Sequence, residues 1–471
     1  MKVLFFLFLS TTLFAANTKD SKLSSISASY DGNALVLKGQ VILDHGMGKM
    51  CADLATLERQ ETNRDFPFSL IHLDKNVQLA LADGAELRCS HADLDFLSLK
   101  GELTAPDKER VIYTQTLSDG QLIRLLTPLV EIAMKKSEGE KSHFIVESLL
   151  AKNGVILDYA SRFTLRADHA DYQNKESSSG PKIFAYPKSE EEKCLLTHEG
   201  DQIEAALVEF DLPTSQFILH EAEGSLASSF HTQAKKGEMH FHAESLVWDQ
   251  PHATLILRGK STVEESALGN LTSDTEIRLM HQISNGKKRL CQLAAFGNTM
   301  LQYRNPETEK MHALVSHGVI HLDRDKLLGT IDSDEGEFLH YEDEDVCCEA
   351  KSALVEYSLV DNVLQPSSLI LKGDVRLFSR DVHKSIHCGF ADRLSFSPTT
   401  KTFILSANPG KKVLFWDETE TTRVSAQEIH ITLDPETKQQ IVKGVGNVKL
   451  LFTDQENAFL KQIFPTHAKA L

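Results

Sequence analysis

The stretch LVLKGQVILDHGMGKMCADLATL, residues Leu35–Leu57, decides the fold. Its first half alternates apolar and polar residues around Gly39, the period-2 pattern of a strand with one buried face. After a glycine-containing polar turn, a second strand places Met50 and Ala52 on one parity, and the apolar positions then move to Ala55 and Leu57. Because a slip of one residue turns every side chain over, the chain must bulge near Asp53–Leu54. We interpret this point as a corner where the strand passes from one sheet to another.

The second half of this stretch, apolar-x-small-polar-x-x-x-apolar, recurs along the chain. Its small residue returns at positions 52, 89, 127, 167, 205, 243, 313, 350, 388 and 426. The steps are 37 to 40 residues, except one of 70 in which a copy near Ser273 or Thr275 has drifted. Nearly constant spacing with the same change of parity indicates a structural repeat.

The amino terminus has the features of a secretory signal peptide over residues 1–16. Met1 and Lys2 precede an apolar run of about a dozen residues, and small residues at Ala15 and Ala16 provide a cleavage site. Such a run is too short to be a transmembrane anchor. The mature protein is therefore expected to be exported.

Charge and cysteine content limit the partners and the covalent structure. The net charge of −17 makes nucleic acid an improbable partner. The seven cysteines leave two readings open. In one reading, Cys51–Cys89 and Cys348–Cys388 form disulfides between neighbouring repeats. We favour the other, in which these cysteines pack as small buried apolar residues.

Composition divides the exported chain into blocks. We expect a first block of repeats at 17–172, a linker or long loop at 173–193 rich in Ser, Gly, Pro and charge, and a second block at 194–452. A tail at 453–471 is expected to form a short helix. Leu122–Met134 has helical spacing interrupted by Pro128, and the repeat register predicts a strand pair there instead. The segment 261–290 fits worst and is expected to be a loop excursion.

These patterns predict one architecture. Strands joined by short polar turns, apolar on one face, with a buried face that continues around corners, form an all-β fold. We expect an elongated antiparallel two-sheet β-jelly roll, built by stacking repeats of about 37 residues.

Several segments resemble a known family. ALVLKGQVIL (34–43) with MCADLATL (50–57), LRADHADY (165–172) and LILKGDVRL (369–377) resemble the OstA-like domain. That domain makes up the periplasmic lipopolysaccharide-transport protein LptA and the amino-terminal part of its outer-membrane partner LptD. The resemblance covers most of residues 26–451, with gaps. It departs from the family in two ways, because the chain is longer than a single bridge subunit and ends without the carboxy-terminal barrel of LptD.

The resemblance implies a V-shaped jelly roll (a β-taco), open along one side, whose apolar interior holds acyl chains of lipopolysaccharide or another glycolipid. It also implies a place in the periplasm and bridge-protein partners that add to edge strands by β-augmentation. The interior positions implied as lipid-lining are Leu35, Leu37, Val41, Leu43, Met50, Ala52, Ala55, Leu57, Leu165, Ala167, Phe241, Ala243, Leu255, Leu257, Leu369, Leu371, Val375 and Leu377.

Other functions find less support in the sequence. It has no phosphate loop, nucleophile elbow or zinc-protease motif, so we expect no enzyme activity and no cofactor. His240 and His242 share a strand face but fit a solvated face better than a metal site. Two alternatives stay open: an exported structural or adhesive repeat protein with a closed core, and a polysaccharide-processing β-helix.

Overall fold

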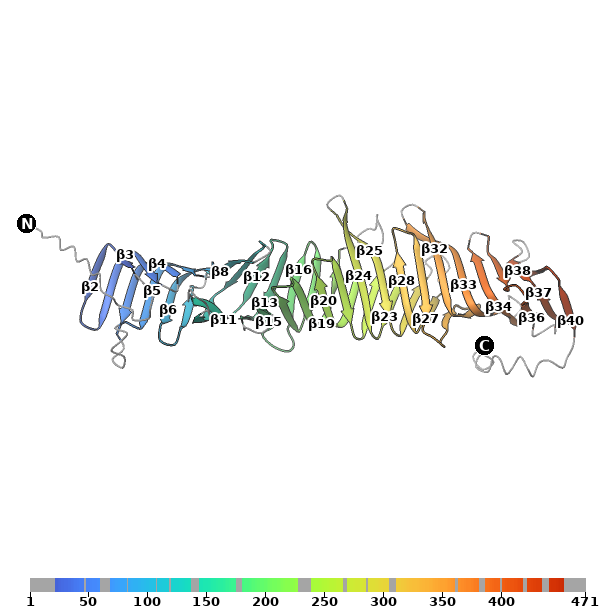
Figure 1. Ribbon diagram of the computed structural model, residues 1–471, viewed down its shortest axis with the longest axis horizontal. Coiled ribbons are helices and arrows are strands. Elements are labelled where there is room, and N and C mark those ends of the chain that lie inside the picture. Colours follow the sequence, from blue (N-terminus) through green and yellow to red (C-terminus); the bar gives the residue numbers. More distant parts are fainter. Residues whose placement is uncertain are drawn as a thin grey trace, which may run out of the picture. The chain divides into compact units, whose positions relative to one another are not determined.

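The chain folds into strands throughout the part that the structure describes. The computed structural model describes residues 22–45, 48–59, 68–82, 84–106, 108–117, 120–136, 144–174, 180–227, 239–265, 269–284, 287–304, 311–360, 363–380, 386–398, 400–417, 422–433 and 440–452. These residues form forty strands and no helix (Figure 1). They belong to two compact units, residues 1–222 and 223–471. The predicted all-β antiparallel class is confirmed. The signal peptide (1–16) and the tail (453–471) lie outside the described residues.

In the first unit, β3 to β6 are long strands and most of the later ones are short. Its strands, the last of which crosses the unit boundary, are β1 (Lys22–Ser24), β2 (Ser27–Tyr30), β3 (Ala34–His45), β4 (Gly48–Glu58), β5 (Leu70–Leu81), β6 (Glu86–Asp95), β7 (Lys100–Thr104), β8 (Val111–Thr116), β9 (Leu122–Thr127), β10 (Leu129–Lys136), β11 (Phe144–Lys152), β12 (Val155–Tyr159), β13 (Phe163–Ala167), β14 (His169–Gln173), β15 (Lys182–Tyr186), β16 (Cys194–His198), β17 (Asp201–Ala205), β18 (Leu207–Asp211) and β19 (Gln216–Leu226).

The second unit is built in the same way. Its strands are β20 (Met239–Asp249), β21 (Thr254–Arg258), β22 (Ser261–Glu265), β23 (Gly269–Ser273), β24 (Glu276–Ser284), β25 (Lys287–Phe296), β26 (Thr299–Arg304), β27 (Met311–Ser316), β28 (Gly318–Asp323), β29 (Leu328–Ser333), β30 (Leu339–Glu342), β31 (Val346–Ala350), β32 (Ser352–Val360), β33 (Val363–Arg380), β34 (Ile386–Ser397), β35 (Thr402–Ser406), β36 (Val413–Asp417), β37 (Thr422–Ala426), β38 (Glu428–Leu433), β39 (Gln440–Val445) and β40 (Lys449–Phe452).

Each unit has two walls, which we call wall A and wall B. In the first unit, β6 pairs with both β7 and β8, and two antiparallel series start from there. Wall A continues as β7-β10-β11-β14-β15-β18, and wall B as β8-β9-β12-β13-β16-β17. The chain runs out along one wall, turns back in a hairpin, rounds a corner and does the same in the other wall. The walls therefore meet at the corners, and the hairpins form the opposite rim.

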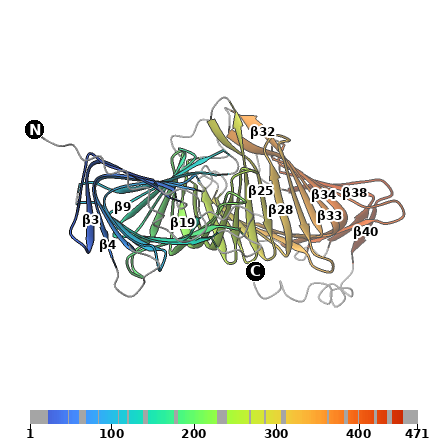
Figure 2. The same cartoon turned by 60° about the vertical axis from the view of Figure 1, so that its left-hand side comes forward.

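The second unit repeats this zigzag. Wall A is β20-β21-β24-β25-β28-β29-β32-β33, and wall B is β20-β22-β23-β26-β27-β30-β31-β33. Beyond β33, the long strand β34 also lies in both walls, and Figure 2 shows β33 and β34 side by side. Each unit is thus one sheet folded at its corners, rather than two separate sheets.

The corner predicted from the opening stretch is present. Pairing of β3 with β4 shifts between Lys38 and Val41, and pairing of β4 with β5 shifts between Cys51 and Leu54. Gly39 occupies the left-handed region at φ 77°, where glycine is favoured. The same shift occurs in β33, between Lys372 and Val375. The K-G-Q-V and K-G-D-V segments are therefore corner bulges.

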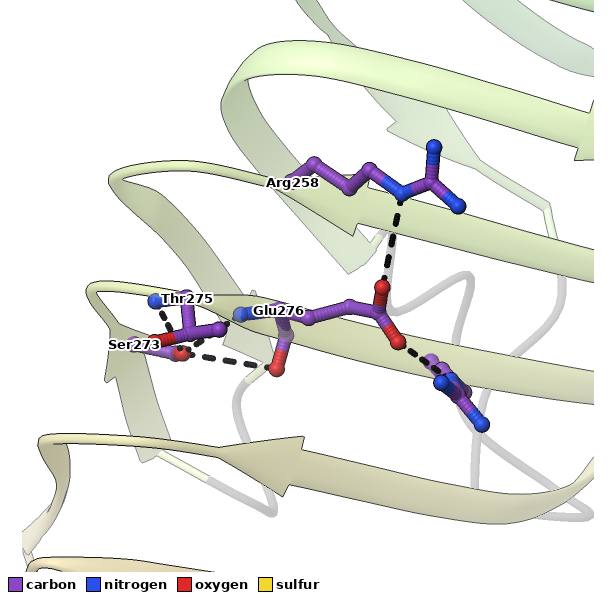
Figure 3. Close-up of polar contacts among 5 residues, drawn as sticks. Arg258, Ser273, Thr275 and Glu276 are labelled. Atoms are coloured by element: carbon purple, nitrogen blue, oxygen red, sulfur yellow. Dashed lines mark hydrogen bonds and ion pairs between the residues drawn. The ribbon is translucent and has the colours of Figure 1, made fainter.

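A buried hydroxyl holds several of the other corners. Between β23 and β24, Ser273 Oγ accepts the backbone N–H groups of Thr275 and Glu276 at 3.1 Å each (Figure 3). It also donates to the carbonyl oxygen of Phe296 at 2.6 Å. Thr127 donates in the same way to the carbonyl of Lys152. These bonds satisfy backbone groups that the change of wall removes from the strand ladder.

Several local expectations need correction. The stretch 173–193 contains β15, which pairs with β14 and β18, and the unit boundary lies at 222/223 instead. The described residues of 261–290 lie mostly in β22, β23, β24 and the start of β25, where we expected a loop excursion. The small residues at 313 and 388, which we expected to mark the repeat, lie three residues before the corners. The small residues at these corners are Ser316 and Ala391. The strand pair predicted for Leu122–Met134 is confirmed as β9 and β10.

The two conceivable disulfides do not fit the strand order. Cys51 on β4 and Cys89 on β6 are separated by β5, and Cys348 on β31 and Cys388 on β34 are separated by β33. Strands two steps apart are about 9.5 Å apart, whereas a disulfide needs Cα atoms within about 7 Å. None of the seven cysteines forms a disulfide in the part of the chain that the structure describes.

Candidate functional site

Most of the positions predicted to line a lipid lie on the interior faces of the walls. Of the eighteen, fifteen are buried, and Leu35, Ala167 and Leu369 are partly buried. Leu37 and Val41 on β3, and Leu371 and Val375 on β33, lie at equivalent places on either side of a corner bulge. An aliphatic interior of this kind stabilises any acyl chain placed in it by about 0.8 kcal/mol per methylene. That these residues line a lipid stays a prediction.

At the rim of the first unit, aromatic side chains join the two walls. We call Tyr159, Phe163, Phe210 and Phe217 the aromatic cluster; each is at most 1% exposed. The first two flank the β12–β13 hairpin of wall B, and the other two flank the β18–β19 hairpin at the edge of wall A. The cluster therefore lies at the rim, opposite the corners.

The contacts within the aromatic cluster are close. The Tyr159 ring centroid lies 4.7 Å from that of Phe210, and Phe163 and Phe217 lie 5.1 Å apart. Tyr159 also donates a hydrogen bond to Ser215 Oγ at 3.0 Å. Aromatic pairs at these separations are stabilising beyond their buried area. The side that the resemblance implies to be open is thus closed at these hairpins.

At the rim of the second unit, charged side chains are buried instead. Asp323, Arg324 and Glu265 are all less than 9% exposed. Burial raises the pKa of the Asp323 carboxyl, but hydrogen bonds from the backbone N–H and Nζ of Lys326 outweigh it and hold that pKa below its usual value. Gln292 donates to the same carboxylate at 3.0 Å. The Asp323 carboxylate is therefore engaged by Lys326 of its own hairpin and by Gln292 of β25.

The outermost strands leave edges with exposed apolar side chains. In the first unit, β1 and β2 each pair with β3 and with no other strand of the described chain, and Ile26 between them is 73% exposed. In the second unit, β39 and β40 form such edges, with Ile441 and Leu450 more than half exposed. Unpaired backbone groups of this kind accept a strand from a partner.

Metal-ligating side chains are not gathered into a site within the described ranges. No set of three His, Cys, Asp or Glu side chains there is arranged to hold a metal ion. His240 and His242 point to solvent on β20. Burial raises the pKa of the Cys89 and Cys194 thiols to about 12, so the nucleophilic thiolate does not form near neutral pH. Among the residues that the structure describes, no helix is long and apolar enough to span a membrane.

The fold and its buried face define an all-β repeat protein of the jelly-roll kind. No protein-family model matches the sequence, and neither does any curated protein. A solved structure, the crystal structure of LptH from Pseudomonas aeruginosa, is similar over 30% of this chain and 95% of its own chain, with 8% identity and a TM-score of 0.25. LptH is described as the LptA homologous periplasmic component of a lipopolysaccharide transport device.

Two features of the rims were not predicted from the sequence. The aromatic residues of the first unit flank hairpins, so a search for Phe or Tyr at both ends of a turn would have found Phe163 and Phe217 as candidates. Arg324 belongs to an Asp-Arg-Asp-Lys turn, a composition typical of solvent-exposed loops. No signal in the sequence marks it as buried.

Proposed function

We propose that this chain is a periplasmic lipid-transport protein that holds the acyl chains of lipopolysaccharide or another glycolipid between its walls. An aliphatic interior face in each unit carries the proposal: Leu37 and Val41 in the first unit and Leu371 and Val375 in the second occupy equivalent places on it. Motif resemblance to the OstA-like family supports the cargo and the periplasmic location. On this proposal the protein acts without enzyme activity or cofactor, since hydrophobic burial is enough to bind a sliding chain.

The edge strands support partners in a bridge. β1 and β2 in the first unit, and β39 and β40 in the second, present backbone groups and apolar side chains together. A neighbouring bridge protein would extend either edge by β-augmentation.

Site-specific photo-crosslinking in cells tests this proposal. A photoreactive residue is placed at Leu37, Val41 or Leu371 on the interior face, and at Lys38 or Lys372 on the outer face as matched controls. Glycolipid adducts at the interior positions and not at the lysines are expected. Absence of lipid at all five positions contradicts the proposal. Mass spectrometry of lipid that co-purifies with the protein identifies the cargo.

A structural or adhesive exported protein is the second candidate, and the aromatic cluster favours it. The protein's own atoms bury Phe210 and Phe217 completely, so at these hairpins the interior is already a packed core. On this reading no interior position captures lipid in the same experiment.

A further inference from the structure

Arg324 occupies an unusual place for an arginine. It follows β28 on the parity of Ile320 and Leu322, which puts it on the interior side of wall A at the rim. Its backbone N–H is bonded to the carbonyl of Cys291, which fixes the start of the hairpin against β25. The residue is only 7% exposed.

The Arg324 guanidinium has no hydrogen bond or ion pair with any residue that the structure describes. Its Nη1 is fully buried and lacks an acceptor, and the Nε of neighbouring Arg289 is buried and unbonded in the same way. Burial lowers the pKa of Arg324, and the positive charge of Arg289 lowers it further. Two cationic groups therefore lie close together, and each has a buried N–H donor for which the described residues provide no acceptor.

The nearby carboxylates leave these donors unused. Asp325 forms its ion pair with Nη2 of Arg289, and Asp323 is held by Gln292 and Lys326. Glu265 faces Arg324 from wall B, and both Glu265 and Asp325 raise its pKa through their charge, without a hydrogen bond to the guanidinium. A buried charge without a hydrogen-bonded partner is strongly destabilising, so its retention calls for a ligand that supplies acceptors.

We propose that Arg324, assisted by Arg289, binds the phosphate group of an amphiphile whose acyl chains lie between the walls. Arginine meets phosphate with paired N–H donors, and such charge-assisted bonds are the strong ones. Ile320 and Leu293, both at most 1% exposed, place an aliphatic surface on the same wall directly inside the rim. The proposal rests on the proposed lipid-transport function and assigns the headgroup end of the cargo to this hairpin.

Binding of defined lipids to the full-length protein tests the inference. The probes are dimyristoyl phosphatidic acid, dimyristoyl glycerol with the same chains and no phosphate, and inorganic phosphate. The variants are Arg324→Gln and, as the control, Lys372→Gln, which removes an exposed cation from the outer face of the same unit. Phosphatidic acid is expected to bind wild type and Lys372→Gln about tenfold tighter than dimyristoyl glycerol, and Arg324→Gln is expected to lose that preference.

The outcomes separate this inference from the proposed function. Equal binding of both lipids to wild type overturns the phosphate site and leaves lipid transport standing. If neither lipid binds, lipid transport fails, and inorganic phosphate decides the site: protection of wild type but not Arg324→Gln against thermal unfolding supports a site for free phosphate, and no protection overturns it.

A second variant tests whether Arg324 is merely structural. Arg324→Met removes the unpaired charge and keeps the apolar part of the side chain. It is expected to raise the midpoint of thermal unfolding of the unliganded protein, because nothing in the hairpin then needs an acceptor. A lowered midpoint would show that Arg324 stabilises the rim through Glu265, and it overturns the proposal.

Discussion

The rims of the two units are both built from hairpins, but different kinds of side chain are buried at them. In the first unit, Tyr159 and Phe163 meet Phe210 and Phe217 across the walls, and every ring is buried. In the second unit, the buried Arg324 and Glu265 face each other from opposite walls. The zigzag of walls and corners therefore does not determine whether a unit is a closed core or a binding trough. The side chains at the hairpins determine it.

This comparison has a consequence for cargo. An amphiphile whose headgroup projects through the rim can occupy the second unit without disturbing aromatic packing. At the β12–β13 hairpin of the first unit, the same headgroup would have to separate the rings of the aromatic cluster. Separating them loses both buried area and ring contacts, so this part of the first unit should resist lipid that the second unit accepts.

The largest effect is expected from Phe217→Ala. Removing this ring leaves a cavity against Phe210, whose centroid lies 4.2 Å away, and should destabilise the first unit by about 3–5 kcal/mol. Urea unfolding followed by hydrogen exchange in residues 144–222 measures the effect. Phe184→Ala on the outer face of β15 is the control and should cost about 1 kcal/mol. Equal losses from the two variants would show that the cluster does not close the rim.

A smaller effect is expected from Ser273→Ala in the second unit. The hydroxyl serves the N–H groups of Thr275 and Glu276 and the carbonyl of Phe296, and its loss leaves buried backbone groups unbonded. The free energy of unfolding should fall by about 1–3 kcal/mol in urea titrations. Thr272→Ala on the neighbouring outward position should change it by less than about 0.5 kcal/mol. An unchanged stability for Ser273→Ala would mean that water replaces the hydroxyl and that the corner does not need it.

Corners and faces were predictable from the sequence, whereas the rims were not. Two local patterns mark the corners: the parity change between Ala52 and Ala55, and the bulge at Gly39. Because such patterns recur at nearly constant spacing along the chain, they are not chance matches. The contact of Tyr159 with Ser215 joins residues 56 positions apart, which no period-2 pattern encodes. A charged turn such as the one around Arg324 has the composition of a solvated loop, because burial depends on what the opposite wall presents.

The same reasoning explains the misplaced boundary. Residues 173–193 have the composition of a linker, but Ile183 and Ala185 are spaced for a strand and complete wall A as part of β15. The polar residues that follow them, 187–193, form the corner before β16. A short strand between polar turns is easily read as a loop when its neighbours in the sheet are unknown.

The smallest predicted effect is a pH dependence of stability that comes from a corner of the first unit. The second unit should not share it. On β5 and β6, His91 lies between Asp74, 2.6 Å from Nδ1, and Asp93, 3.0 Å from Nε2. Burial lowers the pKa of His91, but hydrogen bonds and charge from the two aspartates outweigh it and leave that pKa raised. Burial likewise raises the pKa of Asp93, and His72 and His91 reverse the shift so that it is lowered.

A raised histidine pKa stabilises the fold below the unfolded value of 6.5, and the contribution disappears as pH rises through the folded value. A lowered aspartate pKa stabilises above 3.8 and is lost as pH falls. The first unit should therefore gain a few tenths of a kcal/mol between about pH 4 and 6.5 relative to pH 8, as is usual for half-exposed pairs. Urea titrations across this range should show that His91→Gln removes the gain, while hydrogen exchange in the second unit stays the same in both proteins. A His91→Gln variant with an unchanged pH profile would assign the corner's stability to its backbone bulge rather than to its charges.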